Sequence, residues 1–106
     1  MWNYTGKLGS KRLAEIYITV KSNFSVTPNS WSAIGYKFPF KCKIIQAYTI
    51  PCSASTTVQN YHSEMSNKVR IAAYTDDLRI QLASVSTESA QTFAKGDVIY
   101  IKIIEL

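Results

Sequence analysis

The residues that could do chemistry in this chain are few: two cysteines, one histidine and one adjacent pair of aspartates. Cys42 or Cys52 could supply a thiolate nucleophile, and His62 could act as its base. Neither cysteine lies in a spacing that is typical of metal ligands or redox motifs. Because an isolated cysteine and histidine are more often coincidence than a dyad, we expect a protein that is not an enzyme and binds no cofactor.

The adjacent carboxylates of Asp76 and Asp77 are better explained as a turn. Consecutive side chains of a strand point to opposite faces, so the two carboxylates would not converge on one substrate. The flanking segments, 68–75 and 78–84, alternate between apolar and polar residues. We therefore predict a β-hairpin, with Val69, Ile71 and Ala73 packed on the same side as the apolar residues of the second strand. Sequence motifs for phosphate binding, zinc proteases and serine hydrolases are absent.

The cysteines also indicate the redox setting. If both lie on one extended segment, about 33 Å separates them at ~3.3 Å per residue, whereas a disulfide tolerates Cα atoms only up to about 7 Å apart. They could pair only if Pro51 reversed the chain. We expect two thiols, which is typical of a protein assembled in a reducing cytoplasm.

Composition indicates one globular domain without a membrane segment. The 106 residues are 46% hydrophobic and 18% charged, and no apolar run approaches the roughly 20 residues of a membrane span. Residues 1–7 are mixed and polar, so we expect no signal peptide. The net charge of +5 comes from basic residues spread along the whole chain, which permits an anionic partner without requiring one.

Alternation of apolar and polar residues predicts an all-β protein. Residues 1–11 contain two glycines and are interpreted as an N-terminal arm or linker, followed by a single domain over 12–106. Segment 96–106 is apolar on both faces, so we predict a strand that is covered on both sides, with Ile99, Ile101 and Ile103 on one face. Pro39 marks an edge or a bend between strands. Seven to eight short strands separated by turn residues favour an antiparallel β-sandwich of the jelly-roll kind, with a closed barrel as second choice.

The segment from Tyr36 to Lys43 interleaves aromatic residues with lysines, as a surface that stacks on the bases of single-stranded nucleic acid would require. However, Tyr36, Phe38 and Phe40 share one face at period two, which favours a place in the core. A basic β-barrel that binds nucleic acid through this strand is therefore the alternative function.

The polar loops that carry aromatic residues could instead hold a saccharide, because sugars stack on rings and bond to amides. The candidate ligand contacts are Trp31, Asn60, Tyr61 and His62. A short strand near Thr57–Tyr61 is also expected within the long polar loop.

Three segments, 24–31, 38–48 and 94–101, contain a Val-Thr-Pro-Asn-Ser turn, a Phe-Pro-Phe corner and a Gly-Asp-hydrophobic strand. In this order they resemble small β-sandwich modules of bacteriophage tail fibres and baseplates. The resemblance implies a non-enzymatic virion domain, structural or receptor-binding, that is assembled in the host cytoplasm. It also implies a homo-oligomer, with a trimer favoured, and a host-surface saccharide or other virion proteins as partners. The expected oligomer contacts are Trp2, Tyr4, Tyr100 and Ile104.

Overall fold

The computed structural model of the chain describes residues 1–50, 52, 69–72, 77–85 and 90–106. These residues confirm an all-β fold of antiparallel strands. Nine strands are formed within them: β1 (Asn3–Leu8), β2 (Lys11–Thr19), β3 (Phe24–Val26), β4 (Ser32–Lys37), β5 (Cys42–Ile50), β6 (Val69–Ala72), β7 (Arg79–Ser84), β8 (Gln91–Phe93) and β9 (Val98–Glu105). The predicted strand near Thr57–Tyr61 lies outside the described residues. In the part of the chain that the structure describes, no helix is long and apolar enough to cross a membrane.

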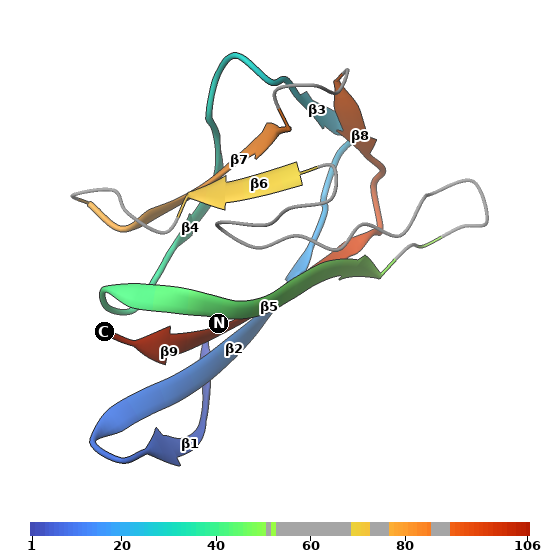
Figure 1. Cartoon of the computed structure of the whole chain (residues 1–106). Helices are drawn as coiled ribbons and strands as arrows, with labels where there is room; N and C mark the ends of the chain where they lie inside the picture. Colours follow the sequence, from blue (N-terminus) through green and yellow to red (C-terminus); the bar gives the residue numbers. More distant parts are fainter. Residues whose placement is uncertain (51, 53–68, 73–76, 86–89) are drawn as a thin grey trace.

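The strands form three sheets. A four-stranded sheet has the order β1-β2-β9-β5, a three-stranded sheet has the order β4-β7-β6, and β3 pairs with β8. In Figure 1 the smaller sheets lie on one side of the four-stranded sheet. The core is made of the apolar residues that the two layers direct toward each other, and it includes Ile16, Ile71, Leu82 and Ile101, each at most 1% exposed.

Strand β9 is the centre of the four-stranded sheet because it pairs with β2 on one side and with β5 on the other. Ile99, Ile101 and Ile103 point into the core and are buried, and Tyr100 on the opposite face is buried as well. The prediction of a strand covered on both faces is therefore confirmed for its middle part. Its β-branched residues suit this position because they pack well on a pleated surface.

The N-terminal segment differs from the expected arm. Asn3–Leu8 forms β1 and pairs with β2 across a two-residue connection, Gly9–Ser10. Gly9 has a φ of +64°, which glycine adopts without steric cost in such a tight hairpin. The glycines that we interpreted as linker residues are turn and bulge residues: the register of β1 shifts between Tyr4 and Gly6.

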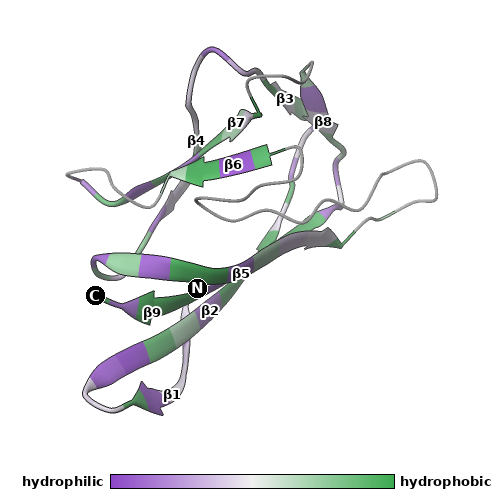
Figure 2. Cartoon of the chain, viewed as in Figure 1, coloured by the Kyte–Doolittle hydropathy of each residue, from purple (hydrophilic) through white to green (hydrophobic). Residues whose placement is uncertain are grey.

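The hairpin between β6 and β7 agrees with its prediction. Ile71 pairs with Leu82, and Val69, Ile71, Ile80 and Leu82 are all buried. Figure 2 shows the alternation on β6 as a polar band, Arg70, between apolar ones. Ala73 and Asp76 lie outside the described residues. Strand β4 ends at Lys37, before the bend that contains Pro39, as the missing amide hydrogen of proline requires.

A turn at residues 94–97 joins the ends of several strands. The carboxylate of Asp97 is fully buried, and its two oxygens accept hydrogen bonds from the backbone N–H groups of Cys52 and Ala94, both at 3.0 Å. The backbone of the same turn exchanges hydrogen bonds with Val20 at the end of β2: Val20 N–H donates to the Asp97 carbonyl, and Gly96 N–H donates to the Val20 carbonyl. The backbone and the Asp97 side chain of this one turn therefore hold together the exit of β2, the exit of β5 and the entry to β9.

We predict that Asp97→Ala lowers the free energy of unfolding by about 3 kcal/mol, because two sheltered N–H groups lose their acceptor. Asp97→Asn should cost less, since one amide oxygen remains. Asp77→Ala is the matched control: it removes a carboxylate that is 47% exposed and paired with Arg79, and should cost less than about 1 kcal/mol. Urea denaturation measures all three, and equal losses for Asp97→Ala and Asp77→Ala would contradict the prediction.

Candidate functional site

One face of the four-stranded sheet points away from the other described strands (Figure 1). The registers of β2, β9 and β5 arrange its side chains in four rows across the sheet. We call this surface the outer face. Its rows are Leu13, Ile104 and Lys43; Glu15, Lys102 and Gln46; Tyr17, Tyr100 and Tyr48; and Thr19, Val98 and Ile50.

The row of three tyrosines is the main feature of the outer face. The ring of Tyr100 lies between those of Tyr17 and Tyr48, with 4.9 Å between ring centroids on each side and tilts of 47° and 37°. Such separations are typical of favourable aromatic pairs across strands. The Tyr100 hydroxyl donates a hydrogen bond of 2.6 Å to the carboxylate of Glu15. Burial, and then this hydrogen bond, raises the pKa of Tyr100, so the phenol stays a donor at neutral pH.

The outer face combines exposed apolar groups with only a few charges. Tyr17 is 52% exposed and Ile50 is 40% exposed, while Leu13, Tyr48, Val98 and Ile104 are half-buried. Ile45, in the bulge of β5, is also exposed. A continuous surface of this kind on a sheet is typical of a contact with another macromolecule.

The four expected oligomer contacts divide between two faces of the sheet. Tyr100 and Ile104 lie on the outer face, although Tyr100 is covered by its neighbours. Trp2 and Tyr4 lie on the core side, where their rings pack against Phe38 and Phe40 at centroid distances of 5.8 and 6.4 Å. The Trp2 indole N–H also donates to the Lys37 carbonyl. The structure thus gives these two residues an intramolecular role in anchoring β1.

An ion pair joins the N-terminal hairpin to the last strand. The guanidinium of Arg12 donates to both carboxylate oxygens of Glu105, at 3.0 and 2.9 Å, and lies 4.6 Å from the ring centroid of Phe40. The side-chain hydrogen bond from Arg12 is the main reason that the pKa of Glu105 falls to about 2. Both partners are partly exposed, so salt should weaken the pair.

We predict an acid-dependent loss of stability that Glu105→Gln removes. The folded pKa of Glu105 lies below its unfolded value, so its contribution is complete above about pH 5 and is lost as the pH falls toward about 2. Between these limits the melting temperature of the parent protein should fall more steeply than that of Glu105→Gln. Adding salt should reduce the difference, and identical pH profiles would contradict the prediction.

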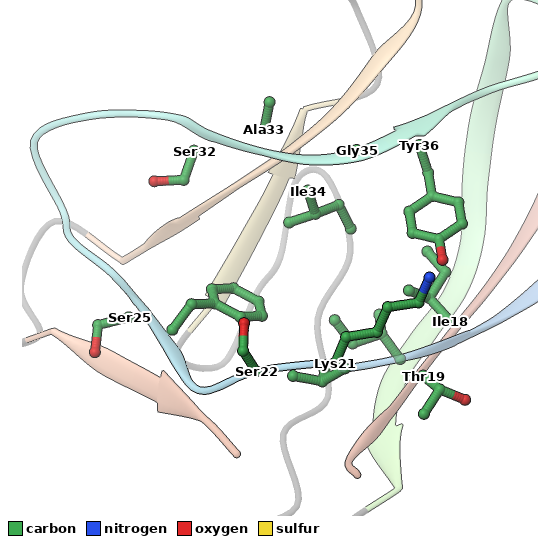
Figure 3. A pocket seen from close by; sticks show the side chains of 13 residues that line it. Ile18, Thr19, Lys21, Ser22, Ser25, Ser32, Ala33, Ile34, Gly35 and Tyr36 are labelled. Atoms are coloured by element: carbon green, nitrogen blue, oxygen red, sulfur yellow. The ribbon is translucent and has the colours of Figure 1, made fainter. Parts of the chain in front are cut away.

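A groove lies between the end of β2, strand β3 and strand β4 (Figure 3). Its volume is about 590 Å³. Ile34 and Tyr36 point into it from β4, and Lys21 extends along it from the segment after β2. The groove exists because the described part of β4 pairs only with β7, on its other side, and because β1 covers the edge of β2 only as far as Glu15.

The predicted saccharide contacts are not brought together in the described residues. Asn60, Tyr61 and His62 lie outside them. Trp31 is 43% exposed and lies away from the groove lining. Its ring packs against the guanidinium of Arg70 at 5.0 Å, and Arg70 itself donates to the carbonyls of Ser84 and Pro28. This contact stabilises the connection between β3 and β4.

The aromatic side chains of the Tyr36–Lys43 segment are not a surface for base stacking. Phe38 is 3% and Phe40 is 9% exposed, and both belong to the core, while Tyr36 is half-buried at the groove. The lysines between them are exposed. The interpretation as a core segment is confirmed for the two phenylalanines, and the nucleic-acid alternative loses the rings on which it depends.

The two cysteines are separate thiols, as expected. Cys42 is fully buried, and burial raises its pKa to about 12, so it does not have the thiolate character of a nucleophile. Cys52 is exposed, and its thiol donates to the Lys95 carbonyl at 3.3 Å. Among the described residues, no group of three or more His, Cys, Asp or Glu side chains could hold a metal ion.

We predict that Cys52 reacts with a thiol reagent in the folded protein, whereas Cys42 reacts only after unfolding. In a folded Cys52→Ser variant near pH 8, Cys42 should be labelled more slowly than in the urea-unfolded chain, by on the order of a thousandfold. Burial suppresses both access of the reagent and formation of the thiolate. Absorbance of the released leaving group measures the rate, and urea should restore it. Rapid native labelling of Cys42 would contradict this assignment.

Sequence reasoning missed the tyrosine row and the groove. Tyr17 and Tyr100 stand on the side of their strands opposite the buried isoleucines, and alternation in the sequence shows this. Alternation alone places Tyr48 on the same face as the buried Cys42 and Ile44, and only the bulge between Ile44 and Gln46 turns it to the outer face. The alignment of the three tyrosines depends on the registers of β2, β9 and β5, which no local pattern specifies. The groove depends on unpaired strand edges, which have no local signal either.

The described residues thus define a small all-β protein with a tyrosine-rich outer face and a groove lined by both polar and apolar groups. In comparisons with protein-family models, curated proteins and solved structures, none matched this chain. The resemblance to phage modules therefore stays a prediction from the sequence segments that carry it.

Proposed function

We propose that this protein is a non-enzymatic structural module that assembles with further copies of itself through the outer face. The layers of strands would form a β-sandwich, and the jelly-roll connectivity stays part of the proposal. A place in a virion follows from the sequence resemblance alone. The observation that carries the proposal is the tyrosine row with its exposed aliphatic neighbours on a sheet face that no other described strand covers.

The chemistry of the outer face favours a protein partner over a sugar. Flat saccharide platforms need ring faces that are open to solvent, whereas the ring of Tyr100 is covered by the two rings beside it. Tyrosine is enriched in protein interfaces because it supplies apolar area with one polar group and loses little conformational entropy. The aliphatic side chains around the row would add to the apolar area removed from water.

The charges of the outer face favour a second copy of the same chain. Glu15 and Lys102 are cross-strand neighbours in one row, so the face carries both signs beside each other. A second copy turned by half a rotation can place Glu15 of each copy opposite Lys102 of the other. This arrangement is isologous and gives a dimer. The trimer that the resemblance implies requires the outer face to meet a different surface of its neighbour.

We predict concentration-dependent self-association that Ile50→Glu abolishes. The face is only three strands wide, so association should be weak and should be measured by sedimentation velocity from about 10 μM to about 1 mM. Ile50 is exposed in the single chain, and a glutamate there should leave the fold intact while placing an uncompensated charge in the contact. Circular dichroism checks the fold of the variant.

Trp31→Glu is the matched control because it also replaces an exposed apolar residue by glutamate, but away from the outer face and beside Arg70. It should associate like the parent protein. The mass of the assembly distinguishes a dimer from a trimer. A parent protein that stays monomeric at the highest concentration, or equal association of the parent and Ile50→Glu, would overturn the proposal.

A further inference from the structure

We infer that the groove between β2, β3 and β4 binds an acidic sugar, that is, a hydroxyl-rich ring that carries a carboxylate. The inference goes beyond self-assembly and involves a surface on the side of β2 and β4, whose described lining shares only Thr19 with the rows of the outer face. It depends on three features of the groove: an apolar wall, a lysine amine that points toward a phenolic hydroxyl, and a described lining of thirteen residues that includes no carboxylate.

The apolar wall consists of side chains that the fold already holds in place. Phe24 lines the groove and stacks on Phe93, with ring centroids 4.9 Å apart and an angle of 14° between the rings. The two residues are also cross-strand partners in the β3–β8 pair. Ile34 points into the groove from β4 (Figure 3), and both Phe24 and Ile34 pack against the core. A wall of this kind can receive the C–H face of a sugar ring with little loss of side-chain entropy.

The polar groups lie where the carboxylate and hydroxyls of such a ring would need partners. In Figure 3 the amine of Lys21 and the hydroxyl of Tyr36 point toward one another from opposite sides of the groove, and the hydroxyl of Ser22 lies farther along the groove, on the side of Ser25. Lys21 can donate a charge-assisted hydrogen bond to a carboxylate. The hydroxyls of Tyr36 and Ser22 can donate or accept, as sugar hydroxyls require.

The size and charge of the groove agree with this ligand class. A volume of about 590 Å³ lies within the usual range for small-molecule sites, roughly 300–1,000 Å³. Because none of the described lining residues is acidic and the whole chain carries a net charge of +5, the electrostatic potential should favour an anion over a neutral sugar. Among the described lining residues there is no nucleophile paired with a base, and the inference is therefore restricted to binding.

The test is a titration of the full chain with glucuronate, glucose and acetate, followed by amide chemical shifts in NMR spectra. Glucuronate should bind saturably, with shifts concentrated at residues 18–25 and 32–36. Glucose and acetate should each bind at least about tenfold more weakly, because each lacks one of the two chemical groups that the groove recognises. The titration is run at a protein concentration below that at which the chain self-associates, and it is repeated with the Ile50→Glu variant. Glucuronate binding is then measured independently of self-association, so the two proposals can fail separately.

Lys21→Gln should weaken glucuronate binding about tenfold and leave glucose binding unchanged. Lys21→Arg keeps the positive charge and should bind glucuronate nearly as well as the parent protein. Lys41→Gln is the matched control, because this exposed lysine lies in the bend before β5, outside both the groove lining and the outer face, and its loss should leave glucuronate binding unchanged. Equal binding of glucuronate and acetate, shifts that map outside the groove, or equal affinity in Lys21→Gln and the parent protein would overturn the inference. No saturable binding of glucuronate at sugar concentrations up to tens of millimolar would also overturn it.

Discussion

The architecture depends on one buried carboxylate and the strand that follows it. Asp97 accepts two backbone hydrogen bonds at the point where β9 begins, and its own backbone bonds to the end of β2. A buried carboxylate is favourable only when its oxygens have partners, and here the partners belong to the segments next to β5 and β8. The same turn therefore fixes the start of β9 relative to its two neighbours. With that start fixed, the register of β2 follows along β9, and that of β5 follows as far as the pair Gln46–Lys102, where the bulge shifts it.

The register of β2 and β5 against β9 connects the Asp97 turn with both the outer face and the groove. The alignment of Tyr17, Tyr100 and Tyr48 holds only if β2 and β5 are each paired with β9 in the observed register. A shift by one residue in either strand would turn its tyrosine toward the core. The groove depends on the same neighbourhood, because Lys21 and Ser22 follow Val20, which is bonded to the Asp97 turn. Assembly and ligand binding would then use two surfaces that are positioned by a single turn.

Local patterns predicted the strands better than they predicted the surfaces. The period-two alternation of segments such as 69–72 and 79–84 identified strands, their buried faces and their pairing, because alternation is decided by residues that are close in sequence. The three-residue strands β3 and β8 are too short to show a pattern, and β1 was missed because its glycines resemble a linker. Trp2 and Tyr4 lie on the opposite face of the sheet from Tyr100. This could not be foreseen from the sequence, since it depends on which side of the sheet faces the second layer. The sites that involve residues 60–62 stay predictions.

The two border strands of the four-stranded sheet share a feature that bears on how the protein avoids uncontrolled polymerisation. β1 carries an irregularity between Tyr4 and Gly6, and β5 carries one between Ile44 and Gln46. Each interrupts the even spacing of amide and carbonyl groups that an incoming strand would need for continuous pairing, and Lys7 and Lys43 place charge beside the interruptions. Growth of the sheet into fibrils from either border is thereby discouraged. In the assembly proposed above, copies would therefore meet face to face without adding strands at either border of the sheet.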